Sequence, residues 1–492
     1  MAQIPNGAEK RTPLSHSLTE NIRQMDRLLG LPTNADFVCR RLEIAGRDAC
    51  VYFLQGMAGG ERIDQFVIEP CQSADRCDSL SDLTHRTLRI CECQTGEYYE
   101  ELVSALVYGK SCLLLDGENE AAMLDTRGFE KRLVGKTQSE SVLMGPQEGF
   151  VENLRTNITL IRRILHTEML VSEDMEIGTR LKTRVSMMYL QGVAREETVD
   201  LVRRRVLSIQ APQCPGSGFL KQMIEDHPGS LFPQMLQTER PDRTASMLSD
   251  GQVALLVDGS PFALIAPVTL FHLLHSADDA YLRWQNGCFL RIVRILGALL
   301  SLVLPALYLA ITIHHNHMIP TDLLISIAES RTKVPFSVFT EILIMELSFF
   351  LINEAGTRIP TIIGPTIGIV GALILGQAAV AASIISPILI IIVAVTGLGG
   401  YAVPYYPLSL SLSALRLALA IVASLFGLYG LTLCMGILTA RLCALQSFGV
   451  PYLAPFSPHR PHNPDLLFRA PIWTQSRHFF LARKKAWIKE ES

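Results

Sequence analysis

The stretch IPTIIGPTIGIVGALILGQAAVAASIISPILIIIVAV, residues 359–395, decides the fold. It opens a run of fifty-seven residues, from Ile359 to Leu415, that contains no Asp, Glu, Lys or Arg. A helix needs about 20 apolar residues to cross the hydrocarbon core of a bilayer. The run therefore predicts two membrane-spanning helices, near Ile362–Ala382 and Ile384–Ala402, and makes this a membrane protein.

Two further spans are predicted on either side of this run, at Ile295–Ile313 and at Leu417–Ala440, the latter between Arg416 and Arg441. Residues 336–352, FSVFTEILIMELSFFLI, are also apolar but include two glutamates. A charged side chain at the bilayer centre costs about 2.5–3.5 kcal/mol on insertion scales. This segment is therefore predicted to be an interfacial or re-entrant helix, or a span buried against protein.

The charge distribution predicts the topology. The tail from Arg441 to Ser492 carries eight Lys or Arg against three acids, a net charge of +5, and segments rich in Lys and Arg next to a span stay in the cytoplasm. The N-terminus, MAQIPNGAEKRTPLSHSLTENIRQ, lacks the apolar segment of a signal peptide. We expect both ends in the cytoplasm and an even number of spans, four if residues 336–352 do not cross and six if they and part of the tail insert.

The first half of the uncharged run has small and polar residues at helical spacing. Glycines three or four residues apart let two helices approach closely, and a hydroxyl or amide in hydrocarbon needs a partner or water. One interpretation is ordinary helix packing within one subunit. The other is a helix that lines a pore at the axis of a symmetric oligomer, with the pore-lining candidates Thr361, Gly364, Thr366, Gly368, Gly371 and Gln377.

Four charged residues before this run are candidates for gating or coupling. Glu341 and Glu346 lie within the apolar segment 336–352, and Glu354 and Arg358 follow it. The last two are four residues apart and can form an ion pair on a helix.

The residues before the first span predict an α/β region. After a disordered N-terminus, residues 1–16, a helix at Ser17–Gly30 opens with a capping-box spacing. Strands and helices then alternate, which is typical of an α/β unit. Strands are expected at Phe37–Ile44, 49–54, 111–115 and 121–124, and helices near 61–68 and 98–108.

This region contains an internal repeat. VYFLQGMAGGERIDQFVI (51–68) aligns without gaps to MMYLQGVAREETVDLVRR (187–204), and LLLDG (113–117) recurs as LLVDG (255–259). Two matches in the same order indicate related units. We infer two αβ subdomains, residues 17–145 and 146–285, followed by a helical polytopic membrane domain, 286–445, and a basic tail, 446–492.

Two charged segments of the second subdomain allow alternatives. Residues 146–165 predict a helix with Arg155, Arg162 and Arg163 on its polar side, which is either solvated or docked on a partner or on lipid headgroups. Residues 232–248, FPQMLQTERPDRTASML, predict a salt-bridged loop because charges of alternating sign lie beside prolines.

Composition excludes several function classes. The net charge is −3, and charges of both signs are scattered along the chain without a basic stripe, which argues against nucleic-acid binding. The eleven cysteines form no CxxC pair and predict neither a disulfide framework nor a zinc site. No P-loop, nucleophile elbow or metal-binding spacing occurs in the sequence. We predict a protein that is not an enzyme, with no catalytic residues, metal or cofactor.

Several long motifs resemble the A-subunits of GerA-type spore germination receptors. The similarity extends from residue 17 to about residue 473. Its motifs are GPQEGFVENLRTN (145–157), FPQMLQTERPDR (232–243), LLVDGSPFALIAP (255–267), HHNHMIPTDLLISIA (314–328) and VPFSVFTEILIMELSFFLINEAGTRIP, which runs into IGIVGALILGQAAVAASIISP.

This resemblance implies a function and partners. It implies a nutrient-sensing receptor in the spore inner membrane, with a transporter-like B-subunit that binds the germinant and a lipoprotein C-subunit. The A-subunit is expected to form a homo-oligomeric ring in lipid that conducts cations and triggers germination. The alternatives are a non-conducting membrane-anchored scaffold and the paralogous subunit encoded with the dipicolinate-channel genes.

Overall fold

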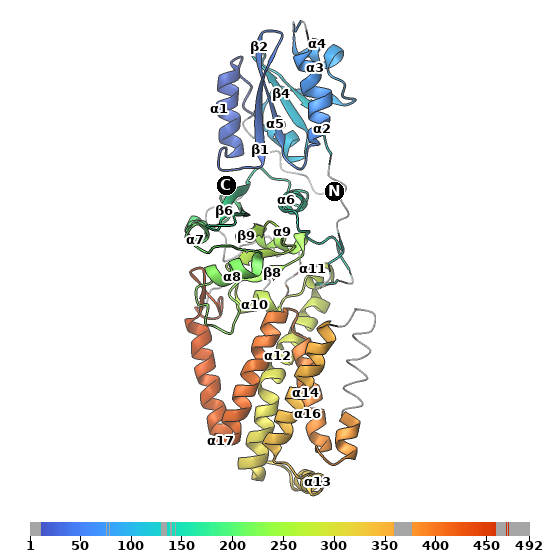
Figure 1. Ribbon diagram of the computed structural model, residues 1–492, viewed down its shortest axis with the longest axis vertical. Helices are drawn as coiled ribbons and strands as arrows, with labels where there is room; N and C mark the ends of the chain where they lie inside the picture. The colour runs from blue at the N-terminus through green and yellow to red at the C-terminus, as the bar shows by residue number, and fades with distance from the viewer. Residues whose placement is uncertain are drawn as a thin grey trace.

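The computed structural model describes residues 11–74, 76–77, 79–128, 135–137, 140–142, 144–358, 376–458, 469 and 471. Two αβ subdomains and a helical bundle follow one another along the long axis of the molecule (Figure 1). The second subdomain lies in the middle and contacts both the first subdomain and the bundle.

The first subdomain is built on a five-stranded sheet with the order β1-β2-β4-β5-β3. Helices α1 and α5 cover one face, and the short helices α2, α3 and α4 cover the other. The elements are α1 (Leu18–Leu29), β1 (Phe37–Ile44), β2 (Arg47–Leu54), α2 (Gly60–Ile63), α3 (Glu69–Gln72), α4 (Leu80–Asp82), β3 (Cys93–Gly96), α5 (Tyr99–Val107), β4 (Ser111–Leu115) and β5 (Ala121–Leu124).

The first predicted helix is confirmed, but its cap is not the predicted one. Helix α1 ends at Gly30, whose φ of 72° lies in the left-handed region that glycine adopts readily. The Ser17 side chain makes no capping hydrogen bond. Instead, Asp116 Oδ1 accepts from the Leu18 N–H at 3.0 Å. Asp116, from a turn distant in sequence, therefore caps the N-terminus of α1 in place of Ser17.

The second subdomain repeats this arrangement with the strand order β6-β7-β9-β10-β8. Helices α7 and α8 cover one face of its sheet, and α6 and α9 cover the face that continues into the core of the bundle. The elements are α6 (Leu154–Arg162), β6 (Leu170–Ile177), β7 (Thr183–Leu190), α7 (Glu196–Leu207), α8 (Ser217–Ile224), β8 (Leu236–Thr238), α9 (Pro241–Ser249), β9 (Val253–Val257), β10 (Ala263–Ala266), α10 (Leu270–Leu274) and α11 (Asp278–Tyr281).

The matching strand orders agree with the repeat in the sequence. Every strand pair in both five-stranded sheets is antiparallel, a property that the alternation of strands and helices left open. Tight hairpins favour this pairing, because Ala45 and Gly46, both with positive φ, connect β1 directly to β2. A hairpin of this length can join only antiparallel strands.

The segment 232–248 is not a loop. It forms β8 and α9, and Pro241 occupies the first turn of α9, where its missing N–H costs no hydrogen bond. The Arg240 side chain is fully buried and bonds Asp242 at 2.8 Å. The predicted salt-bridging of this segment is therefore present, but in a folded strand–helix connection rather than in a loop.

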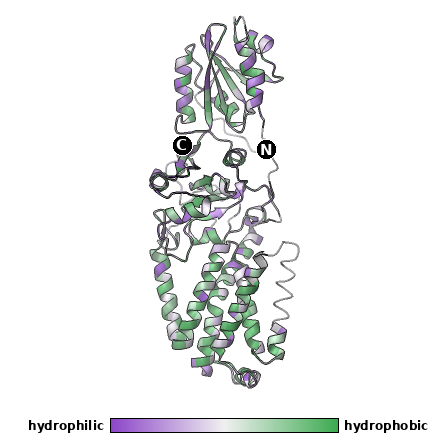
Figure 2. Ribbon diagram, viewed as in Figure 1, coloured by the Kyte–Doolittle hydropathy of each residue, from purple (hydrophilic) through white to green (hydrophobic). Residues whose placement is uncertain are grey.

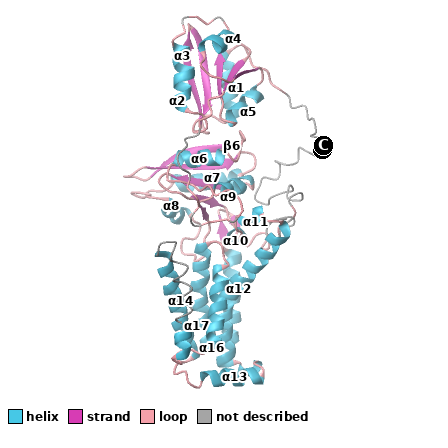
Figure 3. Cartoon of the chain, turned by 90° about the vertical axis from the view of Figure 1, so that its right-hand side faces the viewer, coloured by secondary structure: helices cyan, strands magenta, loops and turns pink. Residues whose placement is uncertain are grey.

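The bundle consists of α12 (Trp284–His314), α14 (Val338–Arg358), α16 (Pro387–Tyr401) and α17 (Tyr406–Ala444), with α13 (Thr321–Arg331) at the end far from the sheets (Figures 1 and 3). Helices α12 and α17 are long and apolar enough to cross a membrane. Figure 2 shows that hydrophobic residues dominate the helices of the bundle, and many of these side chains are exposed, among them Leu296, Leu347 and Leu425. Helix α14 packs one face against α12 and α16, while Leu347, Phe350 and Leu351 on it are exposed.

Helix α17 differs from the single span predicted at Leu417–Ala440. It begins earlier, at Tyr406, and Gly427 interrupts it with φ 60° and ψ −146°. Figure 1 shows two arms that meet at the far end of the bundle. A Cβ on Gly427 would lie 2.9 Å from His315 Cε1 and 3.0 Å from His314 Cβ. Glycine is therefore required for both the backbone conformation and the close contact with the end of α12.

The segment after α17 returns to the second subdomain. Its short hairpin, β11 (Gln446–Ser447) and β12 (Val450–Pro451), is followed by turns up to residue 458. Phe448 enters the apolar core beside α7 and α8, and the buried Tyr452 hydroxyl donates to the Pro233 carbonyl at 2.8 Å. Residues 446–458, the first part of the predicted basic tail, therefore pack against the second subdomain.

Candidate functional site

An ion pair lies in the interior of the apolar bundle. Glu346 of α14 and Arg416 of α17 meet at 2.7 Å, and their side chains are only 13% and 11% exposed. Ionisable residues in such surroundings are costly and mark functional positions by default. The sequence placed Arg416 at the boundary of a span, but the structure places it inside the bundle, opposite a predicted gating candidate.

Arg416 has a further partner, Ser301 on α12, whose carbonyl is made available by a proline. Pro305 lies inside α12, and because proline has no N–H, it leaves the carbonyl of Ser301, four residues earlier, without its helical hydrogen bond. Arg416 Nη1 donates to the Ser301 hydroxyl at 3.0 Å and to this carbonyl at 3.4 Å. One guanidinium thus links α12, α14 and α17. We call Glu346, Arg416 and Ser301 the central node.

A second polar cluster lies nearer the far end. Glu341 is fully buried, and its Oε2 accepts from the Ser386 N–H at 3.0 Å, at the N-terminus of α16. Its Oε1 lies 3.4 Å from Arg331 Nη2, at the end of α13. The helix dipole of α16 and the arginine both stabilise the carboxylate. We call Glu341, Arg331, Ser386 and the neighbouring Tyr308 the outer node.

Close glycine contacts between α12 and α16 lie beside the central node. A Cβ on Gly399 of α16 would lie 2.4 Å from the carbonyl oxygen of Gly297 on α12. A Cβ on Gly400 would lie 3.3 Å from the Ser301 hydroxyl. The close helix approach therefore uses glycines that the sequence analysis did not select. The motif GLGG at 397–400 was a signal for them.

Tyr405 joins the bundle to the second subdomain. Its hydroxyl accepts from the Gln237 N–H at 3.2 Å and donates to the Met235 carbonyl at 3.3 Å, both at strand β8. Burial raises the pKa of Tyr405 above its usual range, so it stays protonated. Any shift of β8 therefore acts directly on the residue that precedes α17.

An ion pair also joins the two subdomains. Arg162 of α6 bonds Asp36 at 3.0 Å and Asn34 Oδ1 at 3.1 Å, with the Arg162 and Asp36 side chains 2% and 1% exposed. Burial raises the pKa of Asp36 and lowers that of Arg162, against the stabilising charge of each partner. The prediction that Arg162 belongs to a solvated or docked basic face is therefore wrong. Arg162 instead holds the second subdomain against the first through its contacts with Asp36 and Asn34.

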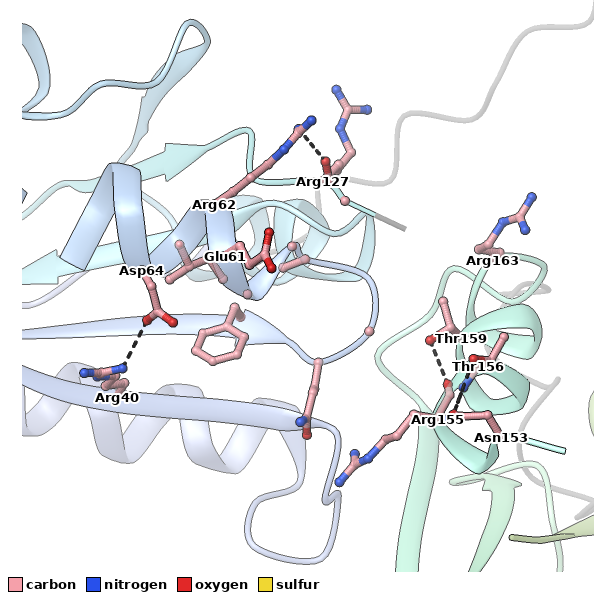
Figure 4. Close-up of a pocket in the computed structure, with 18 of the residues that line it drawn as sticks. Arg40, Glu61, Arg62, Asp64, Arg127, Asn153, Arg155, Thr156, Thr159 and Arg163 are labelled. Carbon is pink, nitrogen blue, oxygen red and sulfur yellow. Dashed lines mark hydrogen bonds and ion pairs between the residues drawn. The ribbon is translucent and has the colours of Figure 1, made fainter. Parts of the chain in front are cut away.

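A cleft of about 1010 Å³ lies beside this junction. Figure 4 shows Arg40 and Asp64 of the first subdomain on one side and Arg155 of α6 on the other. These arginines are paired, Arg40 with Asp64 at 3.3 Å and Arg155 with Asp174 at 3.7 Å. An anionic ligand in the cleft would have to compete with these acids.

The predicted site residues divide into three groups. Glu341 and Glu346 are buried and paired as described. Glu354 is half-buried near the end of α14, and the side chain of Arg358 lies outside the described residues, as do five pore candidates, Thr361, Gly364, Thr366, Gly368 and Gly371. Gln377 is exposed in a short helical stretch. The described residues contain no group of three metal-ligating side chains.

Comparison with known proteins places these features in a family. The family described as Bacillus/Clostridium GerA spore germination protein matches residues 23–479. The chain belongs to this family. Spore germination protein KA of Bacillus subtilis (strain 168) is 36% identical over 478 residues, 95% of this chain and 88% of that protein. GerLA of Bacillus cereus is 34% identical over 454 residues, 91% of this chain and 92% of its own length.

A solved structure is also similar. It is the N-terminal domain of the A subunit of the Bacillus megaterium spore germinant receptor GerK3, with 26% identity and a TM-score of 0.40, covering 53% of this chain and 98% of that domain. Membership of the GerA family makes this chain a spore germination protein and not an enzyme, as the sequence predicts.

Proposed function

We propose that this chain is the A-type subunit of a nutrient-sensing germination receptor in the spore inner membrane, and that it oligomerises into a germinant-gated cation channel. The observation that carries the receptor role is the family match over residues 23–479, which includes both subdomains and the bundle. A transporter-like B-subunit and a lipoprotein C-subunit are its proposed partners. The αβ subdomains and the chain end are proposed to lie in the cytoplasm.

The central node supports a gating role for the bundle. It consists of a buried ion pair between α14 and α17 and of Ser301 on α12, whose hydroxyl and carbonyl accept from Arg416. Such a cluster has a small number of satisfied arrangements, because a partly broken one leaves charges unpaired. A displacement of α17 relative to α14 therefore switches between distinct states rather than sliding continuously. Tyr405 supplies the mechanical link from strand β8 to α17.

The pore assignment rests on the glycine, threonine and glutamine pattern of residues 361–377, and one substitution tests it. Gly371→Leu places a bulky side chain on the proposed pore face and should block potassium release after nutrient addition while the protein stays in the membrane. Gly436→Leu is the matched control, because Gly436 is exposed on α17 and a Cβ there meets nothing within 4 Å. Normal potassium release from Gly371→Leu spores would reject the pore assignment.

Reconstitution separates the channel from the scaffold alternative. Purified full chain in vesicles should conduct cations when assembled with its partners. If it gives no conductance while its N-terminal half alone restores signalling in spores, the bundle is an anchor and another subunit conducts.

A further inference from the structure

Buried polar atoms without a partner gather in the bundle. Among the described residues, nine buried side-chain atoms have no hydrogen-bond partner, and six of them belong to the two nodes: Tyr308 OH, Arg331 Nε, Glu341 Oε1, Glu346 Oε1, Ser386 Oγ and Arg416 Nε. Each such atom costs about 1–3 kcal/mol if it stays dry. Four of the six lie in the outer node, which is therefore the most poorly satisfied polar region of the described chain.

The four atoms come from four different elements and converge on one carboxylate. Tyr308 lies on α12, Arg331 on α13, Glu341 on α14, and Ser386 directly precedes α16. Glu341 receives the Ser386 N–H at 3.0 Å and has Arg331 at 3.4 Å. The Tyr308 hydroxyl lies within the electrostatic reach of Arg331 and Glu341 and near the Ser386 hydroxyl, but the two hydroxyls do not have the geometry of a hydrogen bond. Glu341 and Ser386 are 0% and 1% exposed, so bulk solvent does not reach them directly.

The chemistry of the outer node selects its ligand. A cation would need a net negative site, but the Arg331 guanidinium already neutralises Glu341. The node offers a guanidinium N–H as donor, a carboxylate oxygen as acceptor and two hydroxyls that can do either. Water matches this mixture, since a buried water makes about three hydrogen bonds to polar groups that are otherwise unsatisfied.

We propose that the outer node is a water-binding site in which ordered water molecules bridge Tyr308, Ser386, Glu341 and Arg331. Water would reach the outer node beside Arg331, because this side chain is 26% exposed at the far end of the bundle. The site lies inside one subunit and is separate from any pore at an oligomer axis. It keeps Glu341 in contact with water from the far side, while the central node has no comparably exposed member, its two charged side chains being 13% and 11% exposed.

Radiolytic footprinting of the full chain in nanodiscs tests the proposal, because hydroxyl radicals form from water and modify buried side chains that contact it. Tyr452 is the dry control: its side chain is 0% exposed and its hydroxyl is already paired with the Pro233 carbonyl, whereas Tyr308 is partly buried with an enclosed hydroxyl oxygen. We expect Tyr308 to be modified several-fold faster than Tyr452. Equal rates for the two tyrosines would show a dry site and overturn the proposal.

Removing the hydroxyls gives an independent result. If Tyr308 and Ser386 are dry and unpaired, Tyr308→Phe and Ser386→Ala relieve a penalty and raise the melting temperature of the full chain. If water bridges them, each substitution removes a bridge, and the melting temperature stays equal or falls. Ser386→Ala keeps the backbone N–H that binds Glu341, so it changes the hydroxyl alone. An increase in both variants would refute the water site.

Discussion

Replacement of Glu346 by glutamine should destabilise the bundle strongly. Glutamine keeps the shape of the side chain but removes the charge opposite Arg416. The guanidinium is then left in an apolar interior with neutral acceptors only, the glutamine amide oxygen and the Ser301 hydroxyl and carbonyl. Loss of one partner of a buried ion pair typically costs 3–5 kcal/mol, mainly because the remaining charge is uncompensated.

The structure places the expected cost at the lower end of that range. The side chains of the pair are 13% and 11% exposed rather than fully buried, and Ser301 continues to accept from Arg416. We therefore expect a loss of about 3 kcal/mol in the free energy of unfolding for Glu346→Gln. Removing both charges, as in Glu346→Gln with Arg416→Met, should recover most of it, since no unpaired charge remains.

Chemical denaturation of the purified full chain in detergent measures these values. The wild type, Glu346→Gln, Arg416→Met and the double variant together form a double-mutant cycle. Glu176→Gln is the surface control, because Glu176 pairs with Lys182 at 3.1 Å but both side chains are more than half exposed. It should cost less than about 1 kcal/mol. If Glu346→Gln costs no more than Glu176→Gln, the central node does not hold the bundle together.

Three further predictions concern other parts of the chain. Gly427→Ala should destabilise the helical hairpin of α17 by about 1–3 kcal/mol in thermal unfolding, because the backbone conformation at this position is unfavourable for alanine. Gly436→Ala is the control: a Cβ there meets nothing within 4 Å, so this variant should be neutral or stabilising in the same measurement. Arg162→Met should leave Asp36 buried and unpaired and cost about 3–5 kcal/mol, whereas Arg163→Met, at a 38% exposed side chain, should cost less than about 1 kcal/mol; similar urea midpoints for the two would contradict the buried ion pair. His272 gives the stability of the protein a pH dependence. Burial, reinforced by the charges of Arg243 and Arg291, lowers the pKa of His272 from 6.5 to about 4. As the pH falls, this histidine therefore takes up its proton in the unfolded chain first, and about 3 kcal/mol of stability is lost between pH 6.5 and pH 4. The His272→Gln variant should lose this part of the pH dependence in urea unfolding; an unchanged pH profile would show that His272 is not its source.

The elements of the αβ region could be predicted closely because their signals are local. Strand β1 has the expected bounds, Phe37–Ile44, and α5 covers the expected helix within one residue at each end. The internal repeat predicted two related units, and the two sheets have equivalent strand orders. The antiparallel pairing was not predicted, since the alternation of strands and helices does not reveal which connections are tight turns.

The polar partners in the bundle could not be predicted, because they depend on which residues far apart in sequence become neighbours. Glu346 was recognised as costly in an apolar segment, but Arg416 is 70 residues away along the chain. Gly427 also gave no warning: many glycines occur in the apolar helices, and only the contact with His314 and His315 shows that this one permits a reversal.

The sequence by itself determined the class of the protein, its family, its repeated αβ units and the expense of placing Glu341 and Glu346 among apolar residues. Composition and periodicity indicate the apolar segments and the cost of the glutamates, because the hydrophobic effect acts on every residue independently of its distant neighbours. The family and the repeat follow instead from motifs that match along the chain. Only the tertiary structure decided which groups stabilise these two carboxylates. Ion pairs, a carbonyl freed by Pro305 and glycine contacts act over a few ångströms between separate helices, so they exist only once the helices are packed.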